Sequence, residues 1–245
     1  MIYKKTNELK SISREKMLGK YGTAVGAFLF IRALFMLITD LCRGVANPTG
    51  LILVAILFVL ALIEGVFVYG EQGIYMKIAS GQETKMNDMF AVFKGEADKA
   101  IFARFIYLIM TYVPVTVSVL AIRYAVTNKA MLIPAFLITL VMMVIMSTLL
   151  LTYSQVLLIM HDFPQLGVIA GYRRSRMIMR GRKSALLRIV LSFIPMHCLG
   201  ILSFMAGELF IHPYYKLTLT EFYFDTVRAS SQNTVADGMG LDITV

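Results

Sequence analysis

Two long apolar segments constrain the fold of this chain more than any other feature. The segment "LILVAILFVLALI" (residues 51–63) has thirteen consecutive apolar residues, and residues 130–151 are interrupted only by Pro, Ser and Thr. A helix needs about 20 predominantly apolar residues to cross the ~30 Å hydrocarbon core of a bilayer. Charged residues make up 16% of the chain, whereas soluble domains have about 25%. These features argue against a soluble domain and predict an integral membrane protein.

The hydropathy pattern predicts an all-α, polytopic helical bundle with about six transmembrane helices. The expected helices cover residues 22–42, 51–70, 100–126, 130–160, 184–203 and 206–226. The last carries several ionisable side chains, so it can cross only if it packs against its neighbours or lines a wet cavity. The helices form one transmembrane domain at 22–226. A basic segment at 1–21 precedes it, and a Ser/Gly/Asn/Asp-rich tail at 227–245, expected to be disordered, follows it.

The distribution of Lys and Arg predicts the orientation in the membrane. The first twenty residues contain six basic side chains, residues 161–184 contain another six, and residues 71–99 contain four. The connections expected on the other side contain only Arg43 and Lys129. Because cytoplasmic loops accumulate Lys and Arg, the N-terminus and both long loops are predicted to be cytoplasmic, and six helices return the C-terminus there. A multi-pass protein of the bacterial cytoplasmic membrane, without a cleavable signal peptide, is expected.

Each long cytoplasmic loop is predicted to contain an amphipathic helix, which we call an elbow helix. In residues 84–98 the apolar side chains follow the i, i+3, i+4, i+7 pattern of one helix face: Met86, Met89, Phe90 and Phe93. The second elbow helix runs from about Pro164 to Arg180, and a Gly follows each elbow helix. The two helix–elbow–helix units reflect either an internal repeat, around 51–126 and 130–203, or chance similarity.

The second elbow helix contains the most basic stretch of the chain, "YRRSRMIMRGRKS" (residues 172–184). On a helical wheel four basic residues share an arc of about 80°: Arg173, Arg176, Arg180 and Lys183. The adjoining arc holds Val168, Tyr172, Ser175 and Met179. This profile indicates a helix at the membrane surface whose basic side chains contact anionic lipid headgroups. A basic entrance for an anionic substrate is the alternative, whereas nucleic-acid binding is not expected because no aromatic array accompanies the charges.

Ionisable residues inside membrane helices are functional candidates, because their burial is costly. Glu64 lies in the second helix, and the sixth helix places Glu208, His212 and Lys216 on one face with i, i+4, i+8 spacing. These four residues are the candidate polar pathway, for a substrate or for protons. The alternative is a polar seam that holds the sixth helix in the bundle. Arg104, Arg123 and Arg188 lie near helix ends and are expected to extend to the interface.

No catalytic or cofactor-binding residues are predicted, since no P-loop, nucleophile elbow, dinucleotide fingerprint or zinc motif is present. His161 and Asp162 are two possible metal ligands, but capping and turn formation explain them better, so no metal site is predicted. Cys42 and Cys198 lack the spacing of a disulfide framework and are expected to be buried thiols.

From Tyr153 onward the chain resembles a family of integral membrane proteins of Firmicutes, known as domain of unknown function 975. The similar residues include "TYSQ" (residues 152–155), Asp162, Pro164 and Gly181, followed by "LSFI" (residues 191–194). Further matches are Ser175, Met179, "LG" (199–200), "PY" (213–214), Thr218 and "FY" (222–223). With the layout of the N-terminal half, the resemblance covers about residues 5–226. It implies a fold and a membrane location rather than an activity.

The leading functional expectation is a non-enzymatic membrane protein that transports or exports a small molecule or peptide, or assists such a system. One alternative is a membrane enzyme that acts on phospholipid or isoprenoid-phosphate headgroups, with Arg173, Arg176 and Arg180 holding the phosphate. This enzyme would need a carboxylate or His beside the arginines, and Asp162 with His161 is the only nearby supply. A second alternative is a scaffold whose elbow helices dock a soluble partner protein.

Overall fold

The computed structural model describes residues 3–46, 50–203 and 205–236, and within them the fold is entirely helical. The order of elements is α1 (Thr6–Met17), α2 (Tyr21–Ala46), α3 (Leu51–Ala79), η1 (Met86–Lys94), α4 (Ala97–Thr127), η2 (Lys129–Met131), α5 (Leu132–Tyr153), α6 (Val156–Asp162), α7 (Val168–Ile178), α8 (Lys183–Leu202) and α9 (Glu208–Ala236). The predicted polytopic helical class is confirmed.

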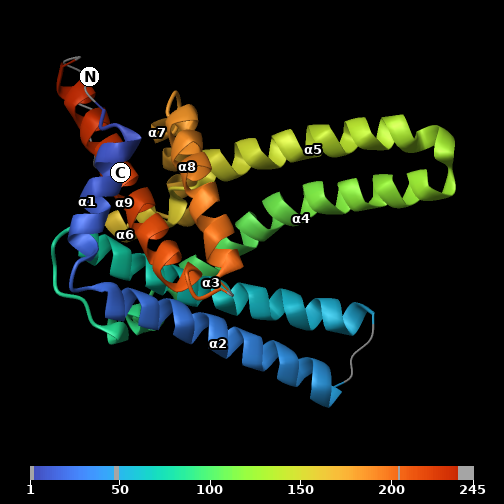
Figure 1. Ribbon diagram of the computed structural model, residues 1–245, viewed down its shortest axis with the longest axis horizontal. Coiled ribbons are helices and arrows are strands. Elements are labelled where there is room, and N and C mark those ends of the chain that lie inside the picture. Colours follow the sequence, from blue (N-terminus) through green and yellow to red (C-terminus); the bar gives the residue numbers. More distant parts are fainter. Residues whose placement is uncertain (1–2, 47–49, 204, 237–245) are drawn as a thin grey trace.

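Four long helices form two hairpins, α2–α3 and α4–α5, that extend in the same direction from the rest of the molecule (Figure 1). Few of their apolar residues are buried inside the protein. In the most apolar window of α4 only 11% of the residues are buried, and in the stretch that contains α5 only 6% are. Side chains this apolar must therefore face lipid. Five stretches of the described chain are long and apolar enough to cross a membrane: Tyr21–Gly44, Ile52–Ala79, Ala97–Thr127, Lys129–Asp162 and Lys183–Leu202.

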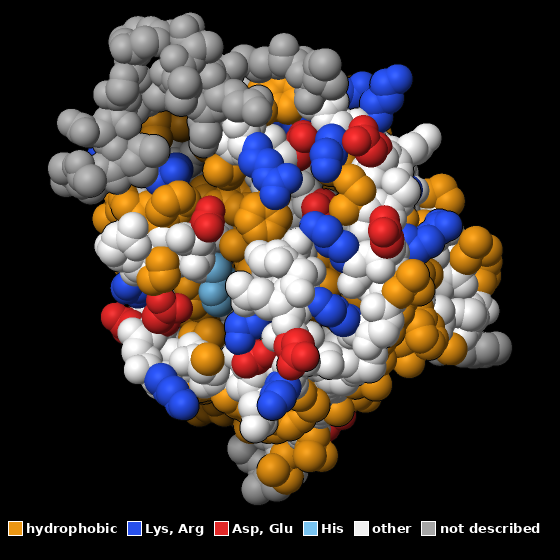
Figure 2. All heavy atoms as spheres, turned by 90° about the vertical axis from the view of Figure 1, so that its left-hand side faces the viewer, with side chains coloured by type: hydrophobic (Ala, Val, Ile, Leu, Met, Phe, Trp, Pro, Cys, Tyr) orange, Lys and Arg blue, Asp and Glu red, His pale blue; other side chains and the backbone are white. Residues whose placement is uncertain are grey.

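The other end of the molecule holds the polar elements α1, η1, α6, α7 and the C-terminal part of α9 (Figure 1). Figure 2 looks onto this end and shows Lys and Arg side chains interspersed with Asp and Glu. The protein core is also concentrated here, because the hairpin tips have few neighbours to pack against. We call this the polar end.

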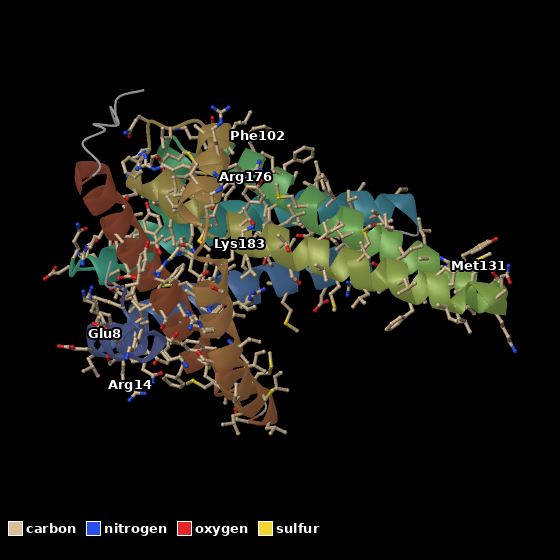
Figure 3. All side chains as sticks on the ribbon, turned by 90° about the horizontal axis from the view of Figure 1, so that it is seen from above. Glu8, Arg14, Phe102, Met131, Arg176 and Lys183 are labelled. Atoms are coloured by element: carbon tan, nitrogen blue, oxygen red, sulfur yellow. The ribbon has the colours of Figure 1, made fainter. Side chains whose placement is uncertain are left out.

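Helix α9, the predicted sixth crossing, is not among the five apolar stretches. It packs against α1, α2, α3 and α8 and buries Tyr214, Leu217, Phe222 and Tyr223. Its polar side chains thus face protein rather than lipid, as its composition requires. Helix α8 runs at a steep angle to the α4–α5 hairpin (Figures 1 and 3). A count of six crossings stays a prediction.

Both terminal segments of the chain are helical over part of their length. Within the basic segment 1–21, α1 buries Leu9, Ser13 and Met17, one residue per helical turn, and packs on α9. At the other terminus α9 continues to Ala236. The expectation of disorder was therefore wrong for residues 227–236, and the remainder of that tail lies outside the described residues.

The two elbow segments differ in helix type. The segment Met86–Lys94 is a 3-10 helix, which has three residues per turn. Met89 and Val92 are therefore buried together, while Phe90 and Phe93 remain 37% and 47% exposed. The predicted α-helical stripe was wrong for this segment. In the second elbow the stripe is confirmed, because Val168, Tyr172, Ser175 and Met179 are all buried, and Gly181 ends the turn with a left-handed φ of +79°.

Close helix contacts to α3 depend on glycines without side chains. A Cβ atom on Gly70 would lie 2.1 Å from the backbone oxygen of Met89 in η1. A Cβ on Gly65 would lie 2.4 Å from the Arg104 side chain of α4. The small residues of α3 are thus the positions where its neighbours approach most closely.

We expect Gly70→Ala to destabilise the protein by about 1–3 kcal/mol, the usual cost of overpacking, because the clashing atom belongs to the backbone and cannot rotate away. Thermal unfolding in detergent would measure the loss. Gly22→Ala is the matched control, since Gly22 also lies in a helix and nothing lies within 4 Å of the added Cβ. An Ala there should be neutral or stabilising; equal effects of the two variants would contradict the packing argument.

Candidate functional site

A groove with a volume of about 450 Å³ lies between α2 and α3. Helix α2 contributes Arg32, Phe35, Met36, Thr39, Asp40 and Arg43, and helix α3 contributes Leu57, Leu60, Ala61 and Glu64. The α2 residues recur at intervals of three or four, which places them on one face of that helix. We call this cavity the α2–α3 groove. Polar and apolar side chains share its walls.

Glu64 joins two arginines in or beside the groove. Its carboxylate accepts hydrogen bonds from Arg32 Nη1 at 3.4 Å and from Arg104 Nη2 at 3.2 Å. Arg104 Nε also donates to the backbone oxygen of Ala61 at 3.2 Å, and its aliphatic part packs over Gly65. The expectation that Arg104 extends to the interface was therefore wrong, because α4 turns this side chain inward onto Glu64.

The groove and its rim carry a small excess of positive charge. Three guanidinium groups, of Arg32, Arg43 and Arg104, face two carboxylates, of Glu64 and Asp40, which leaves one net positive charge if all are ionised. The Arg32 side chain is 62% exposed and is available to a ligand. Because α2 and α3 are membrane-crossing candidates, any of these charges that lies inside the bilayer would be costly to leave unpaired.

A second polar cluster lies along α3 toward the polar end, at Glu71. This carboxylate is only 4% exposed and accepts a hydrogen bond from Tyr75 Oη at 3.0 Å. His212 of α9 places its Nδ1 atom 3.8 Å from Glu71 Oε1. About two turns further along α9, Thr220 Oγ1 accepts a hydrogen bond from Gln72 Nε2 at 3.2 Å. Glu71 is thus enclosed between α3 and α9.

The imidazole of His212 is enclosed between α2, α3 and α9. Its ring stacks on Phe28 with centroids 4.1 Å apart. Its Nδ1 atom is buried without a hydrogen-bond partner. A buried acceptor or donor in that state is costly.

The structure distributes the four predicted pathway residues over three places. Glu64 lies in the groove. Glu208 pairs with His197 of α8, whose Nδ1 lies 3.0 Å from both carboxylate oxygens. His212 approaches Glu71 instead, and the charge of Lys216 acts on both members of that pair. Glu208 and His212 thus contact different helices although they share one face of α9; whether these residues form a pathway stays a prediction.

Sequence reasoning missed Glu71 as a member of this set. Its signal was present: Glu64, Glu71 and Tyr75 have i, i+7, i+11 spacing and therefore share one face of α3. Helix α1 connects the C-terminal end of α3 to α9. Lys16 Nζ donates to Glu221 Oε1 of α9 at 2.7 Å and to the backbone oxygen of Ala79 at 2.6 Å.

The predicted basic arc of the second elbow is exposed at Arg173, Arg176 and Arg180 and half-buried at Lys183. Figure 3 places Arg176 and Lys183 far from the α4–α5 tip at Met131. Arg182, outside the predicted arc, is instead buried. Its Nη2 donates to Asp225 Oδ2 at 2.8 Å, and its guanidinium lies 3.5 Å from the ring centroid of Tyr3.

His161 and Asp162, the acid–base candidates of the enzyme alternative, take part in helix packing. His161 Nε2 lies 2.7 Å from the backbone oxygen of Tyr69, and the two rings stack at 3.9 Å. Asp162 accepts a hydrogen bond from Tyr223 Oη at 2.7 Å. The structure thus gives both side chains roles in docking α6 onto α3 and α9.

The remaining reactive side chains are potential metal ligands and the two cysteines. No cluster of three or more His, Cys, Asp or Glu side chains suited to a metal ion occurs among the described residues. Both cysteines are free thiols. The expected burial was wrong, because Cys198 is exposed on α8 and Cys42 is only half-buried.

Comparison with curated proteins gave no match, and neither did comparison with solved structures. The family model described as "Protein of unknown function (DUF975)" matches residues 1–230. This range includes all the membrane-crossing candidates, the α2–α3 groove and the Glu71 cluster. The chain therefore belongs to the DUF975 family.

Proposed function

We propose that this membrane protein transports or exports an amphiphilic anion, which it binds in the α2–α3 groove. The observation that supports this function is the groove itself: a cavity of about 450 Å³ in which arginines and apolar side chains face the same space. Arginine binds phosphate and carboxylate groups through two parallel hydrogen bonds. The apolar walls suit a hydrocarbon chain.

The position of the groove favours entry from the membrane. Both of its helices are membrane-crossing candidates, and Arg32 is largely exposed. An uncovered charge at membrane depth requires water, a partner or a ligand to offset its desolvation. An amphiphilic anion matches both kinds of lining residue. Its anionic group neutralises the excess positive charge of the arginines, and its tail takes the place of lipid against the apolar side chains.

The polar end is proposed to face the cytoplasm, with the exposed arginines of α7 on anionic lipid headgroups. Its charged surface (Figure 2) and the accumulation of Lys and Arg support this orientation. Each basic residue near an anionic surface contributes about 1 kcal/mol of attraction. The enzyme alternative has less support, because His161 and Asp162 are engaged in packing. Docking of a soluble partner at the elbows is not needed for this function.

A site-specific fluorescence assay tests the proposal. The chain contains no Trp, so Phe35→Trp introduces a single reporter in the groove. Short-chain phosphatidylglycerol should change its emission, whereas the matching phosphatidylcholine and the tail-free headgroup glycerophosphoglycerol should bind less tightly. The first comparison tests the requirement for net negative charge, and the second separates a lipid ligand from a free phosphate ester.

Arg43→Gln and Arg32→Gln, in this reporter background, are expected to weaken phosphatidylglycerol binding about tenfold each, because a hydrogen bond to a charged group contributes about 1.5 kcal/mol or more. Arg123→Gln is the matched control, since Arg123 is exposed on α4 outside the groove. Proteoliposomes should also move a tail-labelled phosphatidylglycerol between leaflets. The proposal is wrong if neither binding nor movement occurs, or if all three variants behave alike.

A further inference from the structure

The Glu71 cluster lies on the same face of α3 as Glu64 of the groove, two turns closer to the polar end. Glu64 and Glu71 are seven residues apart, which is about 10.5 Å along a helix. The two carboxylates differ in environment: Glu64 is paired with two arginines, whereas Glu71 is almost fully enclosed and accepts a hydrogen bond from a neutral hydroxyl. Of these two carboxylates, Glu64 is thus the one with ion-pair partners among the arginines of the described chain.

The geometry provides hydrogen bonds for both protonation states of Glu71. In the ionised state the carboxylate accepts from Tyr75 and is balanced by the charge of Lys216. In the protonated state its hydroxyl can donate to His212 Nδ1, which is buried without a partner. The present 3.8 Å separation is about 1 Å longer than such a bond, so a small side-chain rotation closes it.

Charges from every neighbouring helix determine where the proton resides. The groups that act on the pair are Arg32 from α2, Glu64 and Tyr75 from α3, His197 from α8, and Lys216 from α9. Other charged groups nearby already have partners. Arg104 of α4 is paired with Glu64, and Lys16 of α1 is paired with Glu221 of α9. Asp88 of η1 is paired with Lys77, and His161 of α6 contacts the Tyr69 backbone. Because His212 Nδ1 is buried without a hydrogen-bond partner and lies 3.8 Å from Glu71 Oε1, it is placed to accept a hydrogen bond from Glu71, and Glu71 is the group that carries the proton.

We propose that Glu71 and His212 form a proton-binding site that couples proton uptake to anion binding in the α2–α3 groove. A proton from water forms an O–H bond on Glu71, which donates to His212 Nδ1, and the carboxylate loses its negative charge. Arg32, on which Glu71 acts, then lies in a more positive potential and binds an anion more tightly. The coupling is reciprocal: a bound anion favours the proton. This inference rests on the proposed function of the groove.

The first test compares phosphatidylglycerol affinity at about pH 8 and about pH 5, where a phosphodiester does not titrate but a buried carboxylic acid can. We expect wild-type affinity to rise at least fivefold on acidification, the lower end of usual coupling. Glu71→Gln should bind with the acidic-pH affinity at both values. Glu83→Gln is the control, because it removes a carboxylate from an exposed position outside the groove, and it should keep the pH dependence.

The second test detects the proton without any ligand. Infrared difference spectra of the wild-type protein should show the C=O band of a protonated carboxylic acid on acidification, and Glu71→Gln should lack it. His212→Leu, which removes the acceptor, should keep the band but reduce the proton affinity about fivefold, the value of a hydrogen bond.

The outcomes separate the two proposals. An acid band that persists in Glu71→Gln overturns the proton site. A pH dependence that persists in Glu71→Gln overturns the coupling while the groove function stands. If wild-type protein binds no phosphatidylglycerol at either pH, the groove function and the coupling are both rejected, and the infrared band alone decides whether Glu71 binds a proton.

Discussion

Replacing Arg182 with Met is expected to cost about 3–5 kcal/mol of unfolding free energy, because it leaves the carboxylate of Asp225 buried without its partner. The side chains of the pair are only 10% and 9% exposed. The same guanidinium lies against the rings of Tyr3 and Phe222 and thereby joins the N-terminal segment, the α7–α8 turn and α9. Denaturant or thermal unfolding in detergent would measure the loss.

The matched control for Arg182 comes from the same basic stretch. Arg180→Met removes an identical charge two residues away from an exposed position, and such substitutions change stability by about 0.5 kcal/mol or less. The double variant Arg182→Met with Asp225→Leu should recover most of the loss, because it removes both buried charges. Equal stabilities of the two single variants would show that the Arg182 pair does not hold these elements together.

Replacing Glu64 with Leu is expected to destabilise the protein by about 3 kcal/mol, the approximate cost of an unpaired Arg in the centre of a membrane helix. The substitution removes the only carboxylate that Arg32 and Arg104 are seen to share within the described chain. Arg104 is affected more than Arg32, because it is the less exposed of the two. Thermal unfolding after reconstitution in nanodiscs would measure the effect.

Two further variants establish that charge pairing causes this loss. Glu64→Leu with Arg104→Met removes a charge of each sign and should restore most of the stability. Asp40→Asn, in the same groove, removes a carboxylate from an exposed position and should have little effect on unfolding. If Glu64→Leu is as stable as Asp40→Asn, then Arg104 does not depend on its counter-charge.

The long membrane helices and the basic arc of α7 could be predicted from the sequence because their signals are local. Apolar runs of about 20 residues report membrane-crossing helices without any knowledge of neighbours. Likewise, the 3.6-residue period of α7 separates its buried arc from its exposed arginines. Segments with ambiguous periods were predicted less well, as η1 shows, since Met86–Lys94 has apolar residues at both α-helical and 3-10 spacings.

The sequence by itself determined that this protein belongs in a membrane and which residues place charge there. Only the tertiary structure decided how those charges are paired. Glu64 meets Arg104 across 40 residues, Arg182 meets Asp225 across 43, and Lys16 meets Glu221 across 205. Hydropathy is a property of each segment, whereas an ion pair depends on the distance between two segments. For Glu64 and Arg104 that distance is set by the packing of α4 against Gly65 of α3, and nothing in the sequence around Gly65 names α4 as its neighbour.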